Sequence, residues 1–498
     1  MPTLFVHHYH FRPGGVRRVI ECGLLDWVRS KRWDRIILSS GEEIETGWLA
    51  NLRKSLGGVV LETLVDHRLG YAADLRHGSL PEELEEVGQI FRESWRKSKP
   101  DLVWAHNLSV GRNVRLGLAL AQTCEAEEIP LLCHNHDWWV DQRWNKWREM
   151  SELGIDTLPL AAQATMPTGP LVRHVCVHPR DARILSRHLG EGATWIPNPP
   201  PETAEVSQSQ LLAVKERLGT GPIWLAPCRI LRRKNLIEAV LLTKLLRPEA
   251  TLIVTGRPSS SGEIEYGNAV AQAAKLVGLK YRFGVAEDEH LEISALMAAA
   301  ECTLQTSVQE GFGLPVIEAA TLHRPLILRE LAELTTWLVG SGGKFPLIYK
   351  DIHVPDHLVS STEKDRWKLG WEQECAQLPA AWQNQARDAT SHPSGKFSGF
   401  TLAGQLELLE NWDTLQPALM KANPWLDDWK SLAAKCQLPA ATAPEWSQNW
   451  TEQMDQLLTK SATTGSALAA IQELFETALP DAGKFPILWQ SPQTRGGK

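Results

Sequence analysis

Two glutamates frame a glycine-rich turn in the segment QEGFGLPVIEAA, residues 309–320. Glu310 and Glu318 stand eight positions apart, with Gly311 and Gly313 between them. The preceding run ECTLQT predicts a strand and the following PVIEAATL a helix, so the turn offers backbone N–H groups and a positive helix end to an anion. A carboxylate accepts two hydrogen bonds from a vicinal diol. The spacing therefore suits a sugar nucleotide, and the alternative is an ordinary turn with solvated glutamates.

A basic turn, RILRRKNL, follows the predicted strand WLAPC. It places Arg229 and Lys234 just beyond the end of that strand. Two cations at this position would neutralise a diphosphate and stabilise its negative charge as it departs. The competing interpretation is a solvated basic turn that also includes Arg232 and Arg233.

Polar residues also follow the predicted strand PLLC, in the sequence CHNHDWW. Ligands of open parallel sheets bind outside the carboxyl ends of the strands, so His134, His136 and Asp137 are candidates for a site. A histidine here would hydrogen-bond a sugar hydroxyl, or support positive charge at an anomeric carbon through its carbonyl. The competing interpretation is packing or capping. His134 is the first choice and His136 its close rival.

Three histidines stand in the opening stretch MPTLFVHHYHFRPGGVRRVIE. Alternate side chains of a strand share a face, so His7, His8 and His10 cannot all converge on one metal ion. We predict that His7 and His8 pack at a strand end. His10 and Arg12 would line a ligand-binding loop, where Gly14 permits close approach of a ligand to the backbone.

Short apolar runs alternate with helical patterns in two successive series along the chain. The first series extends from TLFVHH to HVCVHP and the second from PIWLAPC to RPLILRE, with a linker rich in Pro and Ser at 195–210. Near-continuous apolar strands that alternate with helices predict parallel sheets covered on both faces. We therefore predict an α/β protein with two doubly wound, Rossmann-like lobes that face each other across a cleft. Their limits are 1–200 and 201–345.

The remaining stretch, 346–498, is helical in pattern and rich in tryptophan. The whole chain has 21 tryptophans, and each ring buries a large apolar area. Packing is the main interpretation of this excess, and stacking on sugar rings is the alternative. We expect the stretch to form a C-terminal extension with a helix that crosses back to the N-terminal lobe.

The sequence resembles the retaining GT-B glycosyltransferases of family 4 over roughly residues 1–340. EGFGLPVIEA after a strand and the upstream CRILRRKN carry the resemblance, together with PGGVRRV, HPRDARIL followed by WIPNP, the TG of LIVTG and the RFGV turn. The resemblance implies a hexosyltransferase that takes its donor from a nucleotide-diphosphate sugar. It also implies retention at the anomeric carbon without a divalent metal or another cofactor.

The resemblance also implies roles for individual residues. Arg229 and Lys234 match the pair that contacts the diphosphate, Glu310 the residue facing the donor sugar, and Glu318 the residue on the ribose. Further donor-side residues match by position. Gly15 matches the loop glycine of the N-lobe, Gly256 the glycine of the TG, and Phe283 and Val285 the turn beside the base. The loop whose amides approach the donor is matched by Gly311, Phe312, Gly313 and Leu314. His134 or His136 matches the histidine of the N-lobe, and His10, Arg12, Gly14 and Asp137 are assigned to the acceptor side.

The mechanism that these assignments imply is a front-face transfer. The diphosphate leaves, a hydroxyl of the acceptor attacks from the same face, and the departing phosphate oxygen takes its proton. No carboxylate nucleophile is needed, unlike in a retaining hydrolase. Two alternatives stay open, which are a glycoside phosphorylase on the same fold and a non-catalytic glycan-binding or scaffold protein with a degenerate transferase fold.

Composition excludes several classes of protein. The net charge of −7 argues against a dedicated nucleic-acid binder. Eight cysteines without a CxxC pair favour free thiols in a reducing compartment. We expect a cytoplasmic protein, since neither a signal peptide nor a membrane-spanning run is recognisable.

Six basic residues on or just after the first helix suggest contact with anionic membranes, but a solvated helix face is the favoured interpretation: Arg17, Arg18, Arg29, Lys31, Arg32 and Arg35.

Overall fold

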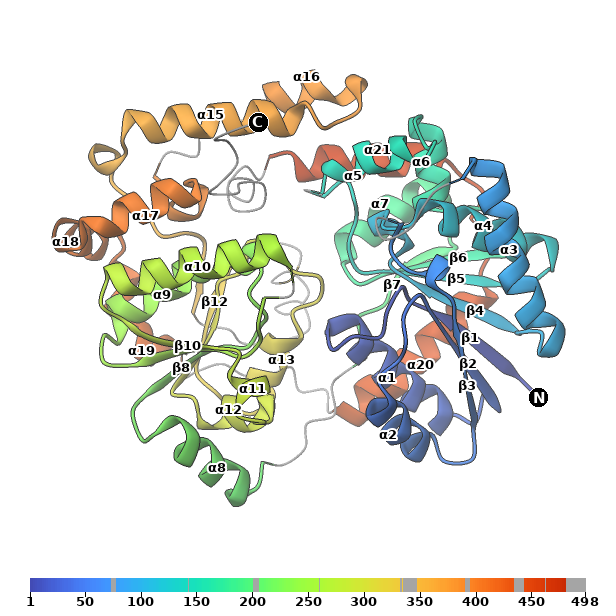
Figure 1. Cartoon of the computed structure of the whole chain (residues 1–498), viewed down its shortest axis with the longest axis horizontal. Coiled ribbons are helices and arrows are strands. Elements are labelled where there is room, and N and C mark those ends of the chain that lie inside the picture. Colours follow the sequence, from blue (N-terminus) through green and yellow to red (C-terminus); the bar gives the residue numbers. More distant parts are fainter. Residues whose placement is uncertain are drawn as a thin grey trace. The chain divides into compact units, whose positions relative to one another are not determined.

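The chain folds into two compact units. Unit 1 comprises residues 1–201, 377–383 and 442–478, and unit 2 comprises residues 202–376, 384–441 and 479–498 (Figure 1). The computed structural model describes residues 1–72, 78–141, 143–199, 206–258, 260–331, 334, 347–389, 395–433, 443–461 and 463–480.

A parallel sheet of seven strands forms the centre of unit 1, in the order β3-β2-β1-β4-β5-β6-β7. The apolar strands β1, β4 and β5 are buried along their whole length, as expected where helices cover both faces of a sheet. The strands are β1 (Thr3–His7), β2 (Arg35–Ser40), β3 (Val60–Val65), β4 (Leu102–His106), β5 (Leu131–Asn135), β6 (Val172–Cys176) and β7 (Ala193–Trp195).

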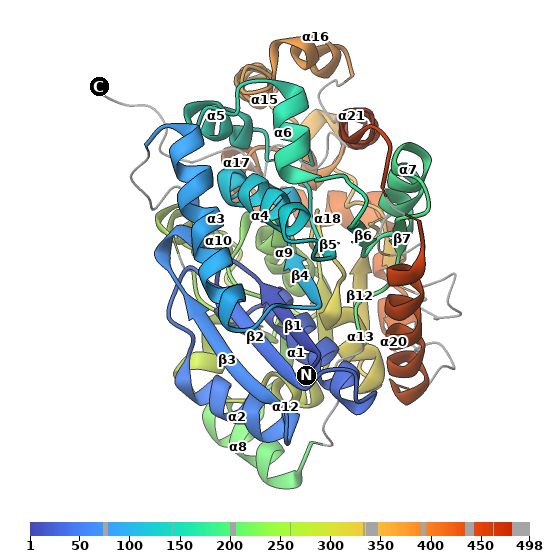
Figure 2. The same ribbon diagram turned by 90° about the vertical axis from the view of Figure 1, so that its right-hand side faces the viewer.

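Helices lie on both faces of this sheet (Figure 2). Successive side chains of a strand point to opposite faces. Leu4 and Val6 of β1 accordingly pack in a core with α1, α2 and α20, whereas Phe5 packs with α3 and α4. The helices of unit 1 are α1 (Gly15–Arg29), α2 (Thr46–Leu56), α3 (Leu80–Lys97), α4 (Val114–Ala126), α5 (Asn145–Glu152), α6 (Leu158–Thr165), α7 (Pro179–Leu189), α20 (Ala443–Thr459) and α21 (Ala467–Ala478).

Two helices from the end of the chain complete the packing of unit 1. Trp450 of α20 is fully buried, and its ring centroid lies 5.3 Å from that of Trp27 and 6.1 Å from that of Trp104. Gly23 of α1 makes room for this contact, because a Cβ at that position would lie 2.8 Å from both Trp104 and Trp450. α21 packs against α6 and α7.

Unit 2 contains a second parallel sheet, with six strands in the order β10-β9-β8-β11-β12-β13. The strands are β8 (Ile223–Ala226), β9 (Thr251–Val254), β10 (Lys280–Phe283), β11 (Cys302–Gln305), β12 (Leu326–Arg329) and β13 (Ile348–Tyr349). The helices before, between or after them are α8 (Gln208–Leu218), α9 (Leu236–Leu246), α10 (Ser261–Leu276), α11 (Val285–Asp288), α12 (Ile293–Ala299), α13 (Leu314–Thr321), α15 (Ser361–Cys375), α17 (Leu402–Glu410), α18 (Trp412–Ala422) and α19 (Trp429–Ala433). α16 (Ala380–Asp388) begins in unit 1 and ends in unit 2. Both predicted parallel sheets are therefore present.

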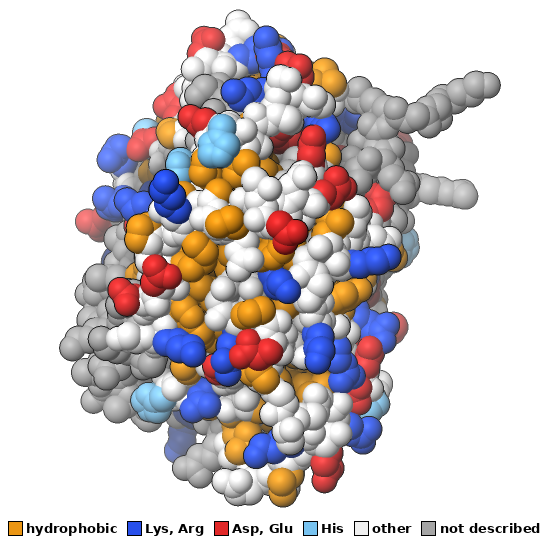
Figure 3. Space-filling model, turned by 90° about the vertical axis from the view of Figure 1, so that its left-hand side faces the viewer, with side chains coloured by type: hydrophobic (Ala, Val, Ile, Leu, Met, Phe, Trp, Pro, Cys, Tyr) orange, Lys and Arg blue, Asp and Glu red, His pale blue; other side chains and the backbone are white. Residues whose placement is uncertain are grey.

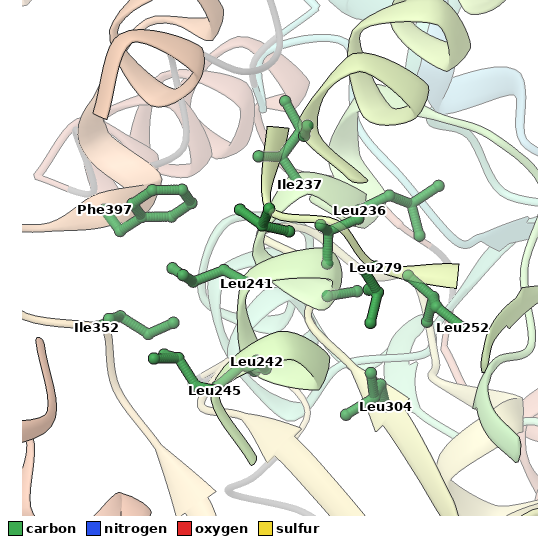
Figure 4. Close-up of a cluster of buried hydrophobic side chains, with 14 of the residues drawn as sticks. Leu236, Ile237, Leu241, Leu242, Leu245, Leu252, Leu279, Leu304, Ile352 and Phe397 are labelled. Atoms are coloured by element: carbon green, nitrogen blue, oxygen red, sulfur yellow. The ribbon is translucent and has the colours of Figure 1, made fainter. Parts of the chain in front are cut away.

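The core of unit 2 surrounds α9, in which Leu236, Leu241, Leu242 and Leu245 are buried (Figure 4). Ile352 and Phe397, which follow the predicted lobe limit at residue 345, belong to this same core. The helices of the predicted extension 346–498 thus divide between the two units: α15, α17, α18 and α19 lie in unit 2, and α20 and α21 in unit 1. The assignment of separate roles to residues 1–200, 201–345 and 346–498 stays a prediction.

Some elements differ from those predicted. The predicted linker 195–210 overlaps the first turn of α8, which begins with a capping box formed by Ser207 and Gln210. α2 and α3 lie in stretches for which no helix was predicted. α3 has many charged residues, and its inward side is marked only by an i, i+3, i+4 series that contains Val87, Ile90 and Phe91.

The basic residues around α1 are mostly paired with carboxylates. Arg17, Arg18, Arg29, Arg32 and Arg35 lie within ion-pair distance of Glu45, Glu21, Asp26, Asp455 and Glu62 respectively.

On the face of the molecule shown in Figure 3, basic, acidic and hydrophobic side chains are interspersed. No helix in the described parts of the chain has both the length and the apolar character needed to cross a bilayer.

The contact of α20 with the core of unit 1 is testable by mutation. We expect Trp450→Ala to lower the free energy of unfolding by about 3–5 kcal/mol, because it removes a buried ring between Trp27 and Trp104. Urea denaturation followed by circular dichroism measures the change. As a control, Leu369→Ala alters a side chain that is 62% exposed, so it should change stability by no more than about 0.5 kcal/mol. Equal effects of the two substitutions would contradict the packing of α20.

Candidate functional site

The glycine-rich turn of unit 2 joins β11 to α13, as predicted. Gly313 precedes the helix with a φ of 77°, in the left-handed region that favours glycine. A Cβ at Gly313 would also lie 2.8 Å from Leu334. Leu314 begins the helix and Pro315 is its second residue, where its missing N–H costs no helical hydrogen bond. The turn therefore leads directly to the positive end of a helix dipole.

Glu310 lies buried in this turn, at the centre of a polar cluster. Its carboxylate accepts hydrogen bonds from Lys234 Nζ at 2.5 Å and from Arg233 Nη1 at 3.1 Å. Gln305 and Ser307, from the end of β11 and the loop after it, donate to the same carboxylate. Burial alone would raise the pKa of Glu310, but the two cations hold it at about 2. The carboxylate is therefore ionised at neutral pH.

The basic turn after β8 holds the cations of this cluster in place. Lys234 ends a short 3₁₀ helix, η4 (Arg232–Lys234), and its side chain is 9% exposed. Two hydrogen bonds tie this turn to the loop after β11. The amide of Val308 donates to the carbonyl of Arg233, and the hydroxyl of Thr306 donates to the carbonyl of Lys234. Glu310 and Lys234, which were predicted as separate site residues, are thus in direct contact.

The other predicted donor-side residues follow the carboxyl ends of neighbouring strands. Arg229 lies after β8, and its Nη2 is 3.6 Å from Glu263 Oε1. Gly256, after β9, lies against it, since a Cβ there would come within 2.8 Å of Arg229 Cγ. Phe283 ends β10 and Val285 begins α11. Because β10, β9, β8 and β11 are adjacent in the sheet, these residues share one edge of it.

The remaining residues of the predicted turn differ in burial. Phe312 is 4% exposed, Gly311 is half-buried, and Glu318 is half-buried on α13. Their assigned contacts with the donor stay predictions.

In unit 1, the loops after β1 and β3 meet at the carboxyl edge of the sheet. His10 Nε2 lies 2.9 Å from Tyr71 Oη, and Arg12 Nε donates to Glu42 Oε2 at 2.7 Å. Gly14 and Gly15 are exposed, and the protein leaves space for a side chain at both positions. Packing within the chain therefore does not require glycine there, and close approach of a ligand stays the predicted reason for it.

A stack of buried histidines crosses β4 and β5. His134 lies within β5 rather than after it, is fully buried and accepts a hydrogen bond from Trp104 Nε1 at 3.3 Å. His136 lies just past the end of the strand, and its Nε2 is 3.1 Å from Nδ1 of His106. Burial lowers the pKa of His136 to about 4 and holds the pKa of His134 and His106 well below the usual value. All three imidazoles are therefore neutral at pH 7.

These three histidines also form a set of nitrogens that could hold a metal ion. Their ring nitrogens lie within 4.8 Å of one another, and three imidazoles are a known ligand set for zinc. The rings, however, lie nearly parallel, at interplanar angles of 16° to 29°. Imidazole lone pairs lie in the ring plane, so in this arrangement they do not converge on one point. That the chemistry needs no metal stays a prediction.

Several residues of these clusters were not among the predicted site residues. Arg143 was missed, although its Nη2 lies 3.3 Å from Oδ2 of the predicted Asp137. Gln305, Ser307, Tyr71 and His106 were likewise missed. Gln305 and His106 end strands and Ser307 follows one, a signal that the sequence pattern contains but that does not distinguish a site residue from a cap. Arg233 had been weighed only as part of a solvated turn.

Comparison with known proteins places this geometry in a wider context. No family model matches the chain. The chain is 21% identical over 402 residues to mannosylglucosyl-3-phosphoglycerate synthase of Petrotoga mobilis, covering 77% of this chain and 75% of that protein. It is 25% identical over 293 residues to mannosylglucosylglycerate synthase of Thermotoga maritima, covering 53% of this chain and 65% of that protein.

Solved structures share the fold over most of the chain. HepE of Anabaena, in complex with UDP and glucose, matches with a TM-score of 0.50 and 13% identity over 92% of this chain and all of that one. A glycosyltransferase of Rickettsia africae matches with a TM-score of 0.51 and 11% identity over 92% of this chain and 99% of that one. The N-terminal domain of trehalose-6-phosphate phosphatase of Candida albicans gives 0.51 and 13%, over 92% and 97%. The chain has the GT-B fold. The prediction of two Rossmann-like lobes is confirmed.

The ionised state of Glu310 predicts a particular dependence of stability on pH. The folded-state pKa of about 2 lies below the ordinary value of 4.5, so the contribution is complete above pH 4.5 and is lost as the pH falls toward 2. Glu310→Gln leaves the buried ammonium of Lys234 without its counter-charge. It should cost about 3–5 kcal/mol at pH 7, and the difference from wild type should shrink below pH 4.5.

Denaturant unfolding between pH 3 and pH 8 measures this difference. Glu301→Gln is the matched control, because Glu301 forms a half-exposed pair with Arg247 at 3.0 Å and should contribute at most about 1 kcal/mol. A difference for Glu310→Gln that is as small as the control at pH 7, or that grows as the pH falls, would overturn the assignment.

Proposed function

We propose that the protein is a retaining glycosyltransferase. It moves a hexosyl group from a nucleotide-diphosphate sugar to a hydroxyl of an acceptor, a glycan, a small sugar or a lipid-linked sugar. The observation that carries the proposal is the buried contact between Glu310 and Lys234 beside the N-terminus of α13. Positive charge and the N-terminus of a helix at one edge of a sheet suit a diphosphate.

The comparisons support the same reaction class. The two relatives are named as synthases of mannosyl and glucosyl compounds, and HepE was solved with UDP and glucose. The fold is that of GT-B glycosyltransferases. A nucleotide-sugar donor bound by unit 2 agrees with all of these.

In this proposal, the residues of unit 2 act on the leaving group and on the donor sugar. Lys234, Arg229 and the helix end stabilise the negative charge that develops on the diphosphate as the bond to the anomeric carbon breaks. Glu310 has two roles, which are to hold Lys234 in position and to accept hydrogen bonds from hydroxyls of the sugar. Glu318 accepts hydrogen bonds from the ribose. The departing phosphate oxygen takes the proton of the attacking acceptor hydroxyl, so the new bond forms on the same face.

In unit 1, we assign the histidine role to His136 in preference to His134. His136 lies just beyond the carboxyl end of β5 and is 6% exposed, whereas His134 lies within the strand and is fully buried. A neutral imidazole at the strand end can hydrogen-bond a sugar hydroxyl without adding charge near the reacting carbon. Nδ1 of His106 lies 3.1 Å from Nε2 of His136, so a hydrogen bond between them couples the tautomers of the two rings.

A panel of UDP-, GDP- and ADP-hexoses tests the function. We expect the purified protein to hydrolyse or transfer from at least one donor, and to do so equally well after treatment with EDTA. NMR of the product should show the anomeric configuration of the donor. Turnover only with inorganic phosphate would indicate a phosphorylase. Neither turnover nor a thermal shift with any nucleotide would indicate a non-catalytic protein and end the proposal.

Paired variants connect this turnover to the site. Lys234→Ala should lower kcat by at least about hundredfold, because it removes charge stabilisation of the leaving group. Lys280→Ala, which removes an exposed lysine of β10, should leave kcat unchanged. Circular dichroism confirms that both variants are folded.

The low pKa of His136 predicts how the rate depends on pH. A group with a pKa of about 4 stays neutral between pH 6 and 8 and becomes charged only as the pH falls toward 4. We therefore expect kcat to show no histidine titration between pH 6 and 8. His136→Ala should lower kcat by about tenfold to hundredfold through the lost hydrogen bond to substrate. A titration near pH 6.5 that vanishes in His136→Ala would contradict the neutral imidazole.

A further inference from the structure

Three basic residues that the proposed reaction does not use follow strand ends in unit 1. Arg112 comes between β4 and α4, Arg143 comes after β5, and Lys146 lies in the first turn of α5. They therefore lie on the edge of the sheet that also carries His10 and Tyr71. Ligands of parallel sheets bind at this edge.

Arg112 differs from its neighbours in how its charge is placed. Among the residues that the structure describes, no carboxylate lies within ion-pair distance of its guanidinium, which is instead 5.1 Å from the centre of the Tyr71 ring. Arg115, one turn later, forms an ion pair with Glu83. Contact with an aromatic face orients a guanidinium and leaves the N–H groups at its edge, in the guanidinium plane, available to a ligand.

Lys146 shows that this region carries concentrated positive charge. Its side chain is 5% exposed and pairs with Glu149. Burial lowers the pKa of its ammonium, and the neighbouring guanidiniums of Arg112 and Arg143 lower it further. Like charges held together out of water are costly unless an anion joins them.

The remaining charges of the region are largely matched in pairs. Arg12 pairs with Glu42 and Arg143 with Asp137, and Asp141 lies in the same loop as Arg143. Tyr71 lies between these groups. Burial raises the pKa of its hydroxyl above the usual value, although Arg112, Arg12 and Arg143 act in the opposite direction. Its hydroxyl is therefore neutral at pH 7 and can donate a hydrogen bond.

We propose that Arg112, with Arg143 and Lys146, binds an anionic group of the acceptor, either a carboxylate or a phosphate ester. The acceptor is then a charged sugar derivative and not a neutral glycan. A guanidinium with free N–H groups binds either anion through two parallel hydrogen bonds, and Tyr71 can donate a third. This inference rests on the proposed function, because it identifies the class of acceptor for that reaction.

Kinetics with matched acceptors test the inference. Each set contains a neutral sugar, its sugar acid and its phosphate ester, and a further arm presents inositol phosphate as the headgroup of phosphatidylinositol vesicles. We expect a charged member of a set to be preferred. Arg112→Gln should lower kcat/KM for that acceptor by about tenfold to hundredfold, mainly through KM, and should leave hydrolysis of the donor without acceptor unchanged. Arg148→Gln is the matched control, since Arg148 lies on α5 with its side chain 76% exposed.

The outcomes separate this inference from the proposed function. Preference for a neutral acceptor, or equal behaviour of Arg112→Gln and Arg148→Gln, would overturn the anion site while leaving the transferase intact. If no donor is turned over at all, the proposed function fails, and calorimetric titration of wild type with inorganic phosphate then decides the anion site alone. Binding that Arg112→Gln abolishes and Arg148→Gln retains supports the site, and any other result refutes it.

Discussion

The contact of Glu310 with Lys234 and Arg233 is the interaction on which the candidate site of unit 2 depends. A carboxylate this deeply buried stays ionised only when cations compensate for the water it has lost. The pairing joins the loop after β8 to the loop after β11, which are neighbouring strands of one sheet. Hydrogen bonds from Thr306 and Val308 hold the same two loops together. The contacts between these two loops therefore determine both the charge of the site and its shape.

The buried polar side chains of unit 1 avoid uncompensated charge in a different way. Its three stacked histidines are buried against one another, and loss of water keeps them neutral, although the nearby carboxylate of Asp137 acts in the opposite direction on the pKa of His136. Beyond the carboxyl ends of the strands, Arg12, Arg143 and Lys146 each pair with a carboxylate. Neutral histidines at the ends of β4 and β5 and paired charges beyond the strands therefore meet at the carboxyl edge of this sheet.

The strands were predictable because parallel strands covered on both faces are nearly continuous apolar runs. β1, β4 and β5 were recognised in this way. α2 and α3 were missed because a surface helix has only one apolar side, and α8 was partly assigned to a linker because its start is rich in serine and glutamine. Glu310 and Lys234 were each recognised from a motif, but their contact with each other was not predicted, and Gln305, Ser307 and Tyr71 belong to no motif. The strand was predicted to end before His134, whereas β5 continues to Asn135. The residue types do not mark that end.

The sequence by itself determined the fold class and the donor-side motif, because apolar periodicity and a glycine-rich turn before a helix are local properties of the chain. Only the tertiary structure decided which long-range partners meet. It placed Trp450 against Trp27 and Trp104, brought Arg233 as well as Lys234 onto Glu310, and set the guanidinium of Arg112 over the ring of Tyr71. Such contacts join residues far apart in the chain. Burial and charge pairing select them, and neither is defined until the chain has folded.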